Sequence, residues 1–211
     1  MTCIVAISDG VNIWMGGDRA ASDVEGTGLE VVKSPKVFAR QSKDGNIWLF
    51  GFEGSFRLGQ LIKHELELPR LTKEQEGDIE KFLVVSFIQA LRQCLRGGGL
   101  LREETSGVEH GGCFIVGLKG MLFIIQEDFH VAQYDHTYAA IGCGEDFAKG
   151  SLFSTQSDPD VEKRILIALE AAQEHSNGVR DPFDFVNSQS IEHAPKTTRS
   201  TRRRPHTKGR K

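Results

Sequence analysis

The first third of the chain carries the pattern of hydrophobic and polar positions that is typical of short antiparallel strands. The β-branched run from Thr2 to Ile7 leads into the turn pair Asp9-Gly10, and the segment 11–17 predicts the returning strand. Two more short strands are predicted at 36–39 and 47–52, with a polar turn between them. The chain therefore opens as antiparallel sheet.

The hydrophobic spacing then changes from two residues to three and four, which predicts helices. A first helix ends before Pro69 and carries the apolar positions Leu58, Leu61, Ile62 and Leu66. A longer amphipathic helix covers 79–95 and stops at the glycine run 97–99.

The second half repeats this order of strands followed by helices. Two strands are predicted at 113–117 and 121–126, and a helix at 145–153. A last helix begins with Asp158 as N-cap and Pro159 in its first position. Strand groups separated from helix groups indicate an α+β domain. Two stacked sheets with helices on both sides, a four-layer α-β-β-α sandwich, would bury every apolar face.

Length and composition restrict the class of protein. A chain of 211 residues, 39% hydrophobic and 26% charged, fits one globular domain. No apolar run reaches the roughly 18 residues that a membrane span needs, and no basic segment precedes the N-terminal apolar residues. We therefore expect a cytoplasmic protein without a membrane partner. Its four cysteines have no metal-ligand spacing and are expected to be reduced, so no metal is predicted.

The charge is distributed unevenly along the chain. Residues 196–211 hold eight Lys or Arg and no acid, which leaves 18 of the 26 basic residues against all 29 acidic ones. Residues 188–211 are expected to form a basic, disordered tail behind a domain that covers 2–187. The tail could bind nucleic acid or an acidic neighbouring subunit, or it could be solvated without a partner.

Thr2 is a candidate nucleophile because removal of Met1 would give it a free α-amine. Such an amine has a pKa near 7.7–8.0, so it can take the proton of the hydroxyl on the same residue, through a water. By itself an N-terminal Met-Thr is common and carries little weight. The motifs elsewhere in the chain give Thr2 more weight as a candidate nucleophile.

Several short motifs occur in an order that resembles one family. They are the strand opened by Thr2, the strand that ends in Gly17-Asp18-Arg19, the segment Pro35-Lys36-Val37-Phe38, the Gly51-Phe52-Glu53-Gly54 turn before the first helix, Gly142-Cys143-Gly144 before the third helix and Ser176-Asn177-Gly178 after the fourth. Together they resemble the proteasome β-type subunits and the bacterial ring peptidases, which are threonine peptidases among the N-terminal nucleophile (Ntn) hydrolases. The resemblance implies an Ntn-type α-β-β-α sandwich.

The resemblance also implies roles for individual residues. Thr2 matches the nucleophile, Asp18 the buried acid that holds the catalytic lysine, Lys36 that lysine, and the N–H of Gly51 the oxyanion donor. Lys33 stays open as an alternative to Lys36, because the segment after Asp18 is about two residues longer than in the relatives.

Supporting positions depart from the family pattern. Cys143 stands where relatives commonly have a serine, Ser176 matches a serine of the relatives, and Gln173 stands three residues before it, where relatives often have an aspartate. Arg19, beside Asp18, is a further supporting residue. An N-terminal Cys3, exposed by loss of two residues, is the less favoured nucleophile.

The resulting expectation is a threonine endopeptidase that cleaves peptides or unfolded proteins inside a homo-oligomeric ring, without a cofactor. An ATP-dependent unfoldase is a possible partner. An Ntn amidohydrolase acting on a small amide, and a catalytically silent structural ring subunit, are the alternatives. Nucleic acid would be bound only through the basic tail.

Overall fold

The computed structural model describes residues 2–22, 28–103, 109–189 and 196–198. Two five-stranded sheets dominate it, and all strand pairs are antiparallel. The first sheet has the order β12 (Tyr138–Ile141), β1 (Ile4–Ser8), β2 (Ile13–Gly17), β13 (Phe183–Asn187) and β14 (Lys196–Thr198). The second has the order β11 (Val131–Ala132), β10 (Met121–Ile125), β9 (Phe114–Leu118), β6 (Ile47–Phe52) and β5 (Val37–Gln41). Two small two-stranded sheets pair β3 (Ala20–Ser22) with β4 (Leu29–Val31) and β7 (Arg102–Glu103) with β8 (Glu109–His110).

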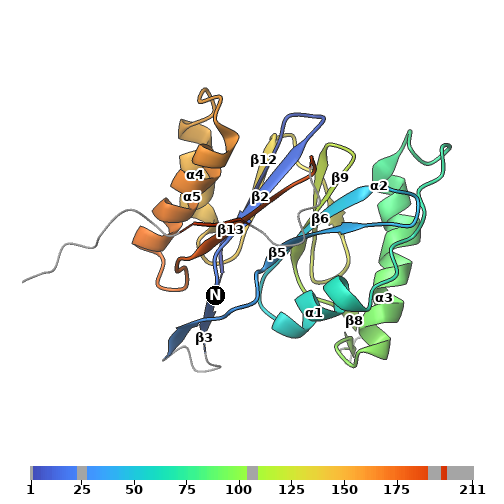
Figure 1. Ribbon diagram of the computed structural model, residues 1–211. Helices are drawn as coiled ribbons and strands as arrows, with labels where there is room; N and C mark the ends of the chain where they lie inside the picture. Colours follow the sequence, from blue (N-terminus) through green and yellow to red (C-terminus); the bar gives the residue numbers. More distant parts are fainter. Residues whose placement is uncertain (1, 23–27, 104–108, 190–195, 199–211) are drawn as a thin grey trace, which may run out of the picture.

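The helices come in two groups, one after each run of strands. The first group is α1 (Phe56–His64) and a continuous helical segment made of α2 (Ile79–Phe82), the π-helical turn η1 (Leu83–Phe87) and α3 (Ile88–Gly97). The second group is α4 (Glu145–Ser154) and α5 (Val161–His175). Figure 1 shows the first group beside the sheet that contains β5 and β6, and the second group on the opposite side of the molecule.

Three hydrophobic clusters hold these layers together. Ile4 and Met15 of the first sheet pack against Leu49 and Ile115 of the second, so one cluster lies between the sheets. A second cluster joins α1, α2, η1 and α3 to the outer face of the second sheet, and a third joins α4 and α5 to the outer face of the first. β1 is buried on both faces, which explains why its sequence is nearly continuous in apolar residues rather than alternating.

The predicted α+β class is confirmed, and each predicted helix is present. The start of the last helix was predicted wrongly. The N-cap of α5 is Asp160, whose side chain accepts a hydrogen bond from the N–H of Lys163 at 3.0 Å, whereas Asp158 accepts one from the N–H of Asp160. Two aspartates so close together compete for the same role, and the pattern alone did not separate them.

The predicted disordered tail also needs a correction. Residues 196–198 form β14, which pairs with β13 at the edge of the first sheet. Ser188, the first residue of the predicted tail, is fixed to Ile13 by two hydrogen bonds of 2.9 Å. Ser188 and residues 196–198 are thus ordered against the first sheet, the domain boundary at 187 stays a prediction, and 190–195 and 199–211 lie outside the described residues.

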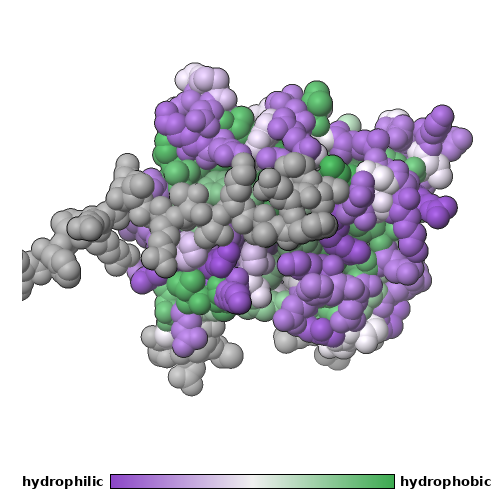
Figure 2. Space-filling view, viewed as in Figure 1, coloured by the Kyte–Doolittle hydropathy of each residue, from purple (hydrophilic) through white to green (hydrophobic). Residues whose placement is uncertain are grey.

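The described surface is largely hydrophilic on the face seen in Figure 2. Several large apolar side chains are nevertheless exposed, among them Phe147 and Phe153 on α4 and Val84 and Val85 on η1. None of the helices within the described ranges has the length and apolar character needed to cross a bilayer.

Candidate active site

The β1–β2 hairpin brings the two ends of its strands together. Ile4 pairs with Gly17, so Thr2 and Cys3, just before β1, lie next to Asp18, just after β2. Lys36 arrives from the other sheet, where it immediately precedes β5. The stacking of the two sheets therefore places three residues that are distant in sequence at one point between the layers.

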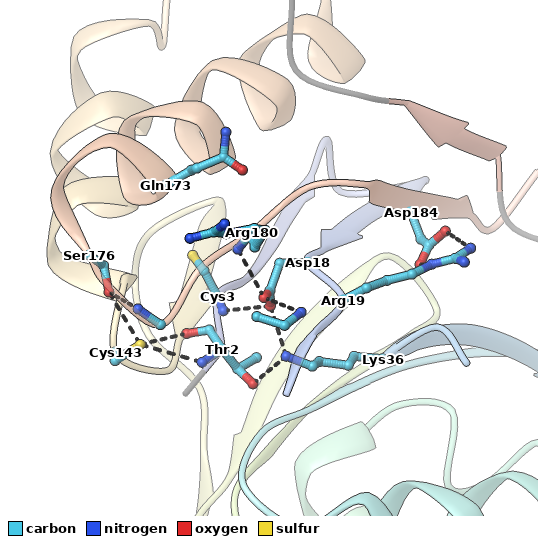
Figure 3. A network of polar contacts seen from close by, with 12 residues as sticks. Thr2, Cys3, Asp18, Arg19, Lys36, Cys143, Gln173, Ser176, Arg180 and Asp184 are labelled. Atoms are coloured by element: carbon cyan, nitrogen blue, oxygen red, sulfur yellow. Dashed lines mark hydrogen bonds and ion pairs between the residues drawn. The ribbon is translucent and has the colours of Figure 1, made fainter. Parts of the chain in front are cut away.

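Lys36 connects the other two residues directly. Its Nζ donates to Thr2 Oγ1 at 2.7 Å and to Asp18 Oδ1 at 3.0 Å (Figure 3). Thr2 and Lys36 are each 2% exposed, and Asp18 is completely buried. The hydroxyl thus faces a cation at hydrogen-bond distance in surroundings from which water is largely excluded.

Asp18 is fixed by backbone donors as well as by the lysine. Its two carboxylate oxygens accept hydrogen bonds from the N–H groups of Cys3 at 3.0 Å, Ala20 at 2.8 Å and Arg180 at 3.4 Å. Burial raises the pKa of Asp18, and the Lys36 charge and these N–H donors oppose that rise. Burial likewise lowers the pKa of Lys36, and the Asp18 charge opposes that fall.

The geometry bears on the two alternatives that the sequence left open. Lys36 contacts Thr2, whereas Lys33 is exposed two residues after β4. Cys3 is completely buried on the α4–α5 side of β1, and burial raises the pKa of its thiol well above the usual range. A thiol held neutral in this way is a poor nucleophile.

Cys143 and Ser176 form a chain of contacts to the other side of Thr2. The backbone N of Thr2 lies 3.4 Å from Cys143 Sγ, and that thiol also lies 3.5 Å from the Thr2 carbonyl oxygen. Ser176 Oγ in turn donates to Cys143 Sγ at 3.3 Å. The residue in the serine position of the relatives therefore still contacts the Thr2 backbone, through sulfur in place of oxygen (Figure 3).

Gln173 serves a different contact. Its Oε1 accepts a hydrogen bond from the N–H of Asp181 at 2.5 Å, and so ties α5 to the segment that carries Arg180 toward Asp18.

Two glycines allow close approach of neighbouring segments, Gly142 at Thr2 and Gly51 between the two sheets. Gly142 has a φ of +97°, and a Cβ placed on it would lie 2.3 Å from the Thr2 carbonyl oxygen, so a side chain cannot fit there. Gly51 lies in β6, paired with Val37 and Ile115, where an added Cβ would meet Ile4 and Met15 of the facing sheet. Because Gly51 pairs with Val37, the residue after Lys36, it lies close to Lys36 along the β5–β6 pair. Its role as oxyanion donor stays a prediction.

Arg19 does not reach Thr2 but fixes the backbone beside Asp18. Its guanidinium makes two hydrogen bonds, of 2.7 and 2.6 Å, to Asp184 of β13, whose carboxylate is completely buried. The Asp184 hydrogen bonds raise the pKa of Arg19. Sequence reasoning missed Asp184 and Arg180, because each lies more than 160 residues from its partner and neither belongs to a recognisable motif.

No group of three or more His, Cys, Asp or Glu side chains in the described ranges is arranged to hold a metal ion. The site's chemistry is that of a hydroxyl, a buried ammonium and a buried carboxylate.

Comparison with known proteins places the fold in a structural class. The sequence matches no family model and no curated protein. Solved structures do match over nearly the whole chain. A Thiobacillus denitrificans BPH in complex with epoxomicin is 17% identical, with a TM-score of 0.67, over 88% of this chain and 97% of that one. The HslV of Trypanosoma brucei is 19% identical, with a TM-score of 0.61, over 88% and 98%. An Anbu protein, an ancestral β-subunit, from Yersinia bercovieri is 13% identical, with a TM-score of 0.64, over 95% and 88%.

The chain therefore has the fold of the proteasome-like peptidases of the HslV and BPH types and of the Anbu proteins. This confirms, at the level of fold, the resemblance that the sequence motifs indicated.

Proposed function

We propose that the protein is a threonine endopeptidase of the Ntn type, active after removal of Met1. The observation that carries the proposal is the buried connection from Asp18 through Lys36 to the Thr2 hydroxyl, with distances of 3.0 and 2.7 Å. The fold shared with proteasome-like peptidases supports it. The layer order of the described elements agrees with the four-layer Ntn sandwich.

The chemistry begins with the liberated α-amine of Thr2 as the base. It takes the Oγ1 proton, through a water, as Oγ1 attacks the carbonyl carbon of the scissile peptide bond. The Lys36 ammonium, 2.7 Å from Oγ1, lowers the energy of the negative charge that develops there. Its charge also lowers the pKa of the nearby amine, which keeps the amine unprotonated at neutral pH.

The tetrahedral intermediate then collapses. The C–N bond breaks, the leaving amine takes the proton held by the α-amine, and an ester remains on Thr2. Water, deprotonated by the same amine, hydrolyses the ester and restores the hydroxyl. Gly51 is the candidate N–H donor to the oxyanion. Cys143 and Ser176 hold the Thr2 backbone in place during these steps.

We further propose that the active sites face the interior of a homo-oligomer in the cytoplasm. One similar structure is a helical assembly of the Anbu complex from Pseudomonas aeruginosa, which supports self-association in this fold. The exposed Phe147 and Phe153 on α4 supply apolar surface for such a contact. The substrates are peptides or unfolded chains, with an unfoldase as a candidate partner.

Peptide turnover by the wild type and two variants tests the proposal. Thr2→Ala should remove turnover of fluorogenic peptides, and Thr2→Ser should retain a measurable part because it keeps both the amine and a hydroxyl. A Thr2→Ala protein as active as the wild type would exclude the mechanism. Turnover of small acyl amides but not of peptides would favour the amidohydrolase alternative.

A further inference from the structure

A cavity of about 770 Å³ lies next to the candidate nucleophile. Gly142 forms part of its wall, and the position of a Cβ on Gly142 lies 2.3 Å from the Thr2 carbonyl oxygen and 3.2 Å from Glu53 Oε2. Thr2, in the candidate active site, and Glu53, in the wall of the cavity, therefore both lie beside Gly142. A volume of this size is in the range of pockets that hold ligand groups.

The charge of the cavity wall is strongly negative. Its acidic residues are Glu53, Glu127, Asp128 and Glu145, and they come from three separate places in the chain around the two sheets and α4. The lysine in the wall, Lys149, is engaged by Glu145, with 3.1 Å between Nζ and Oε2. Two histidines also line the cavity. The balance of charge favours a cation inside it.

Glu53 shows the electrostatic effect of this arrangement. Burial raises its pKa, and the nearby Glu145 and Glu127 carboxylates raise it further, while a hydrogen bond from the Cys113 thiol opposes the rise. A positive charge in the cavity would relieve the repulsion among these carboxylates and return the pKa of Glu53 toward its ordinary value.

The residues of the wall favour a basic side chain rather than a metal ion as the cation in the cavity. Within the described residues these acids do not gather into a group that could coordinate a metal. Apolar and aromatic surface lies among them, from Ile124, Tyr134, Tyr138 and Ile141. An aliphatic stem on apolar surface with a charged head at carboxylates is how lysine and arginine side chains are accommodated.

We propose that this cavity is a specificity subsite that binds the Lys or Arg side chain of a peptide substrate close to the scissile bond. The proposal rests on the proposed peptidase function. It adds the substrate class, which is peptides with a basic residue beside the cleaved bond. Glu53 and Glu127 are the residues that would bind the charge.

Matched fluorogenic peptides test the subsite. The peptides differ at one residue, which is Arg, citrulline, Leu or Glu. This residue is placed in turn on either side of the scissile bond. Citrulline keeps the length and shape of arginine and removes its charge. For the wild type we expect kcat/KM to be at least about tenfold higher for Arg than for citrulline, and lowest for Glu. Glu53→Gln and Glu127→Gln should each reduce the Arg-to-citrulline ratio at least about threefold, and the exposed control Glu67→Gln should leave it unchanged.

The outcomes separate this inference from the proposed function. Equal cleavage of the Arg and citrulline peptides, with turnover still lost in Thr2→Ala, overturns the subsite and leaves the peptidase intact. Absence of turnover for every peptide overturns both. If Glu53→Gln does not fold, the wild-type preference and the Glu127→Gln ratio decide the question. A ratio unchanged in a folded Glu127→Gln protein, together with no wild-type preference for Arg, contradicts the proposal.

Discussion

Asp18 and Cys3 are linked by a hydrogen bond of 3.0 Å from the Cys3 N–H to Asp18 Oδ1, the same oxygen that receives Lys36. One carboxylate oxygen thus fixes both the cation and the backbone that follows Thr2. The position of the hydroxyl relative to the ammonium is set by a single buried group, which gives the site little freedom to relax when any of its members is changed.

Replacing Lys36 by methionine should remove the charge that stabilises the Thr2 oxygen. We expect peptide turnover to fall at least about 100-fold, measured as kcat/KM. Loss of the cation also leaves Asp18 buried without its partner, which costs about 3–5 kcal/mol of unfolding free energy, so circular dichroism should accompany the assay. Lys33→Met is the matched control, because that lysine is exposed and away from Thr2. Loss of turnover in Lys33→Met, with full turnover in Lys36→Met, would reverse the assignment.

The dependence of kcat/KM on pH should be bell-shaped. The rate rises as the α-amine of Thr2 loses its proton, at a pKa held below about 7.7–8.0 by the Lys36 charge. It falls as Lys36 itself is deprotonated, and because burial lowers the pKa of Lys36 from 10.5, this fall begins below pH 10.5. A rate that continues to rise up to pH 10.5 would show that the charged lysine is not required.

The Arg19–Asp184 pair should contribute to stability rather than to chemistry. Arg19→Met removes the guanidinium that makes two hydrogen bonds to the completely buried Asp184 carboxylate, and we expect a loss of about 3–5 kcal/mol in urea unfolding. Lys43→Met, which removes a lysine from an exposed pair with Glu67, should change the unfolding free energy by less than about 0.5 kcal/mol. The double variant Arg19→Met, Asp184→Asn should recover part of the loss. Equal stability of Arg19→Met and the wild type would contradict the importance of the pair.

Gly142→Ala should impair activity through a steric effect on Thr2. The added Cβ meets the Thr2 carbonyl oxygen at 2.3 Å, so the nucleophile must shift, and kcat/KM should fall at least about tenfold. Gly45→Ala is a matched control, because Gly45 has a similar φ of +86° with nothing near the added Cβ. It should share the backbone strain, about 1 kcal/mol or more, and keep its activity. Similar kcat/KM values for the two variants would show that contact with Thr2 is not the cause.

Much of the fold could be predicted from local pattern. The helix spacing of Leu58, Leu61 and Ile62, and the turn at Asp9-Gly10, depend on neighbouring residues, and both predicted elements are present. The short strands β3 and β4 were not predicted, because three-residue strands leave too little pattern to recognise. β14 was missed for another reason: its strand forms by pairing with β13, whereas its own composition favours disorder.

The candidate site, too, could be predicted from the sequence only in part. Thr2, Asp18 and Lys36 could be named in advance because each belongs to a motif at a strand end, and the structure brings them within hydrogen-bond distance. Asp184 and Arg180 could not, since they enter through the pairing of β13 with β2 and the loop before it. The acidic cavity was also invisible in the sequence, because its carboxylates converge only after both sheets and α4 have packed.

The most direct test of the central claim is a mass-spectrometric map of the purified protein after treatment with epoxomicin, the compound bound in the similar Thiobacillus denitrificans structure. The account predicts that the first peptide lacks Met1 and carries the covalent adduct on Thr2, and that the adduct is absent from Lys36→Met. A protein that retains Met1, or that is modified at another residue while Thr2 stays free, would contradict it.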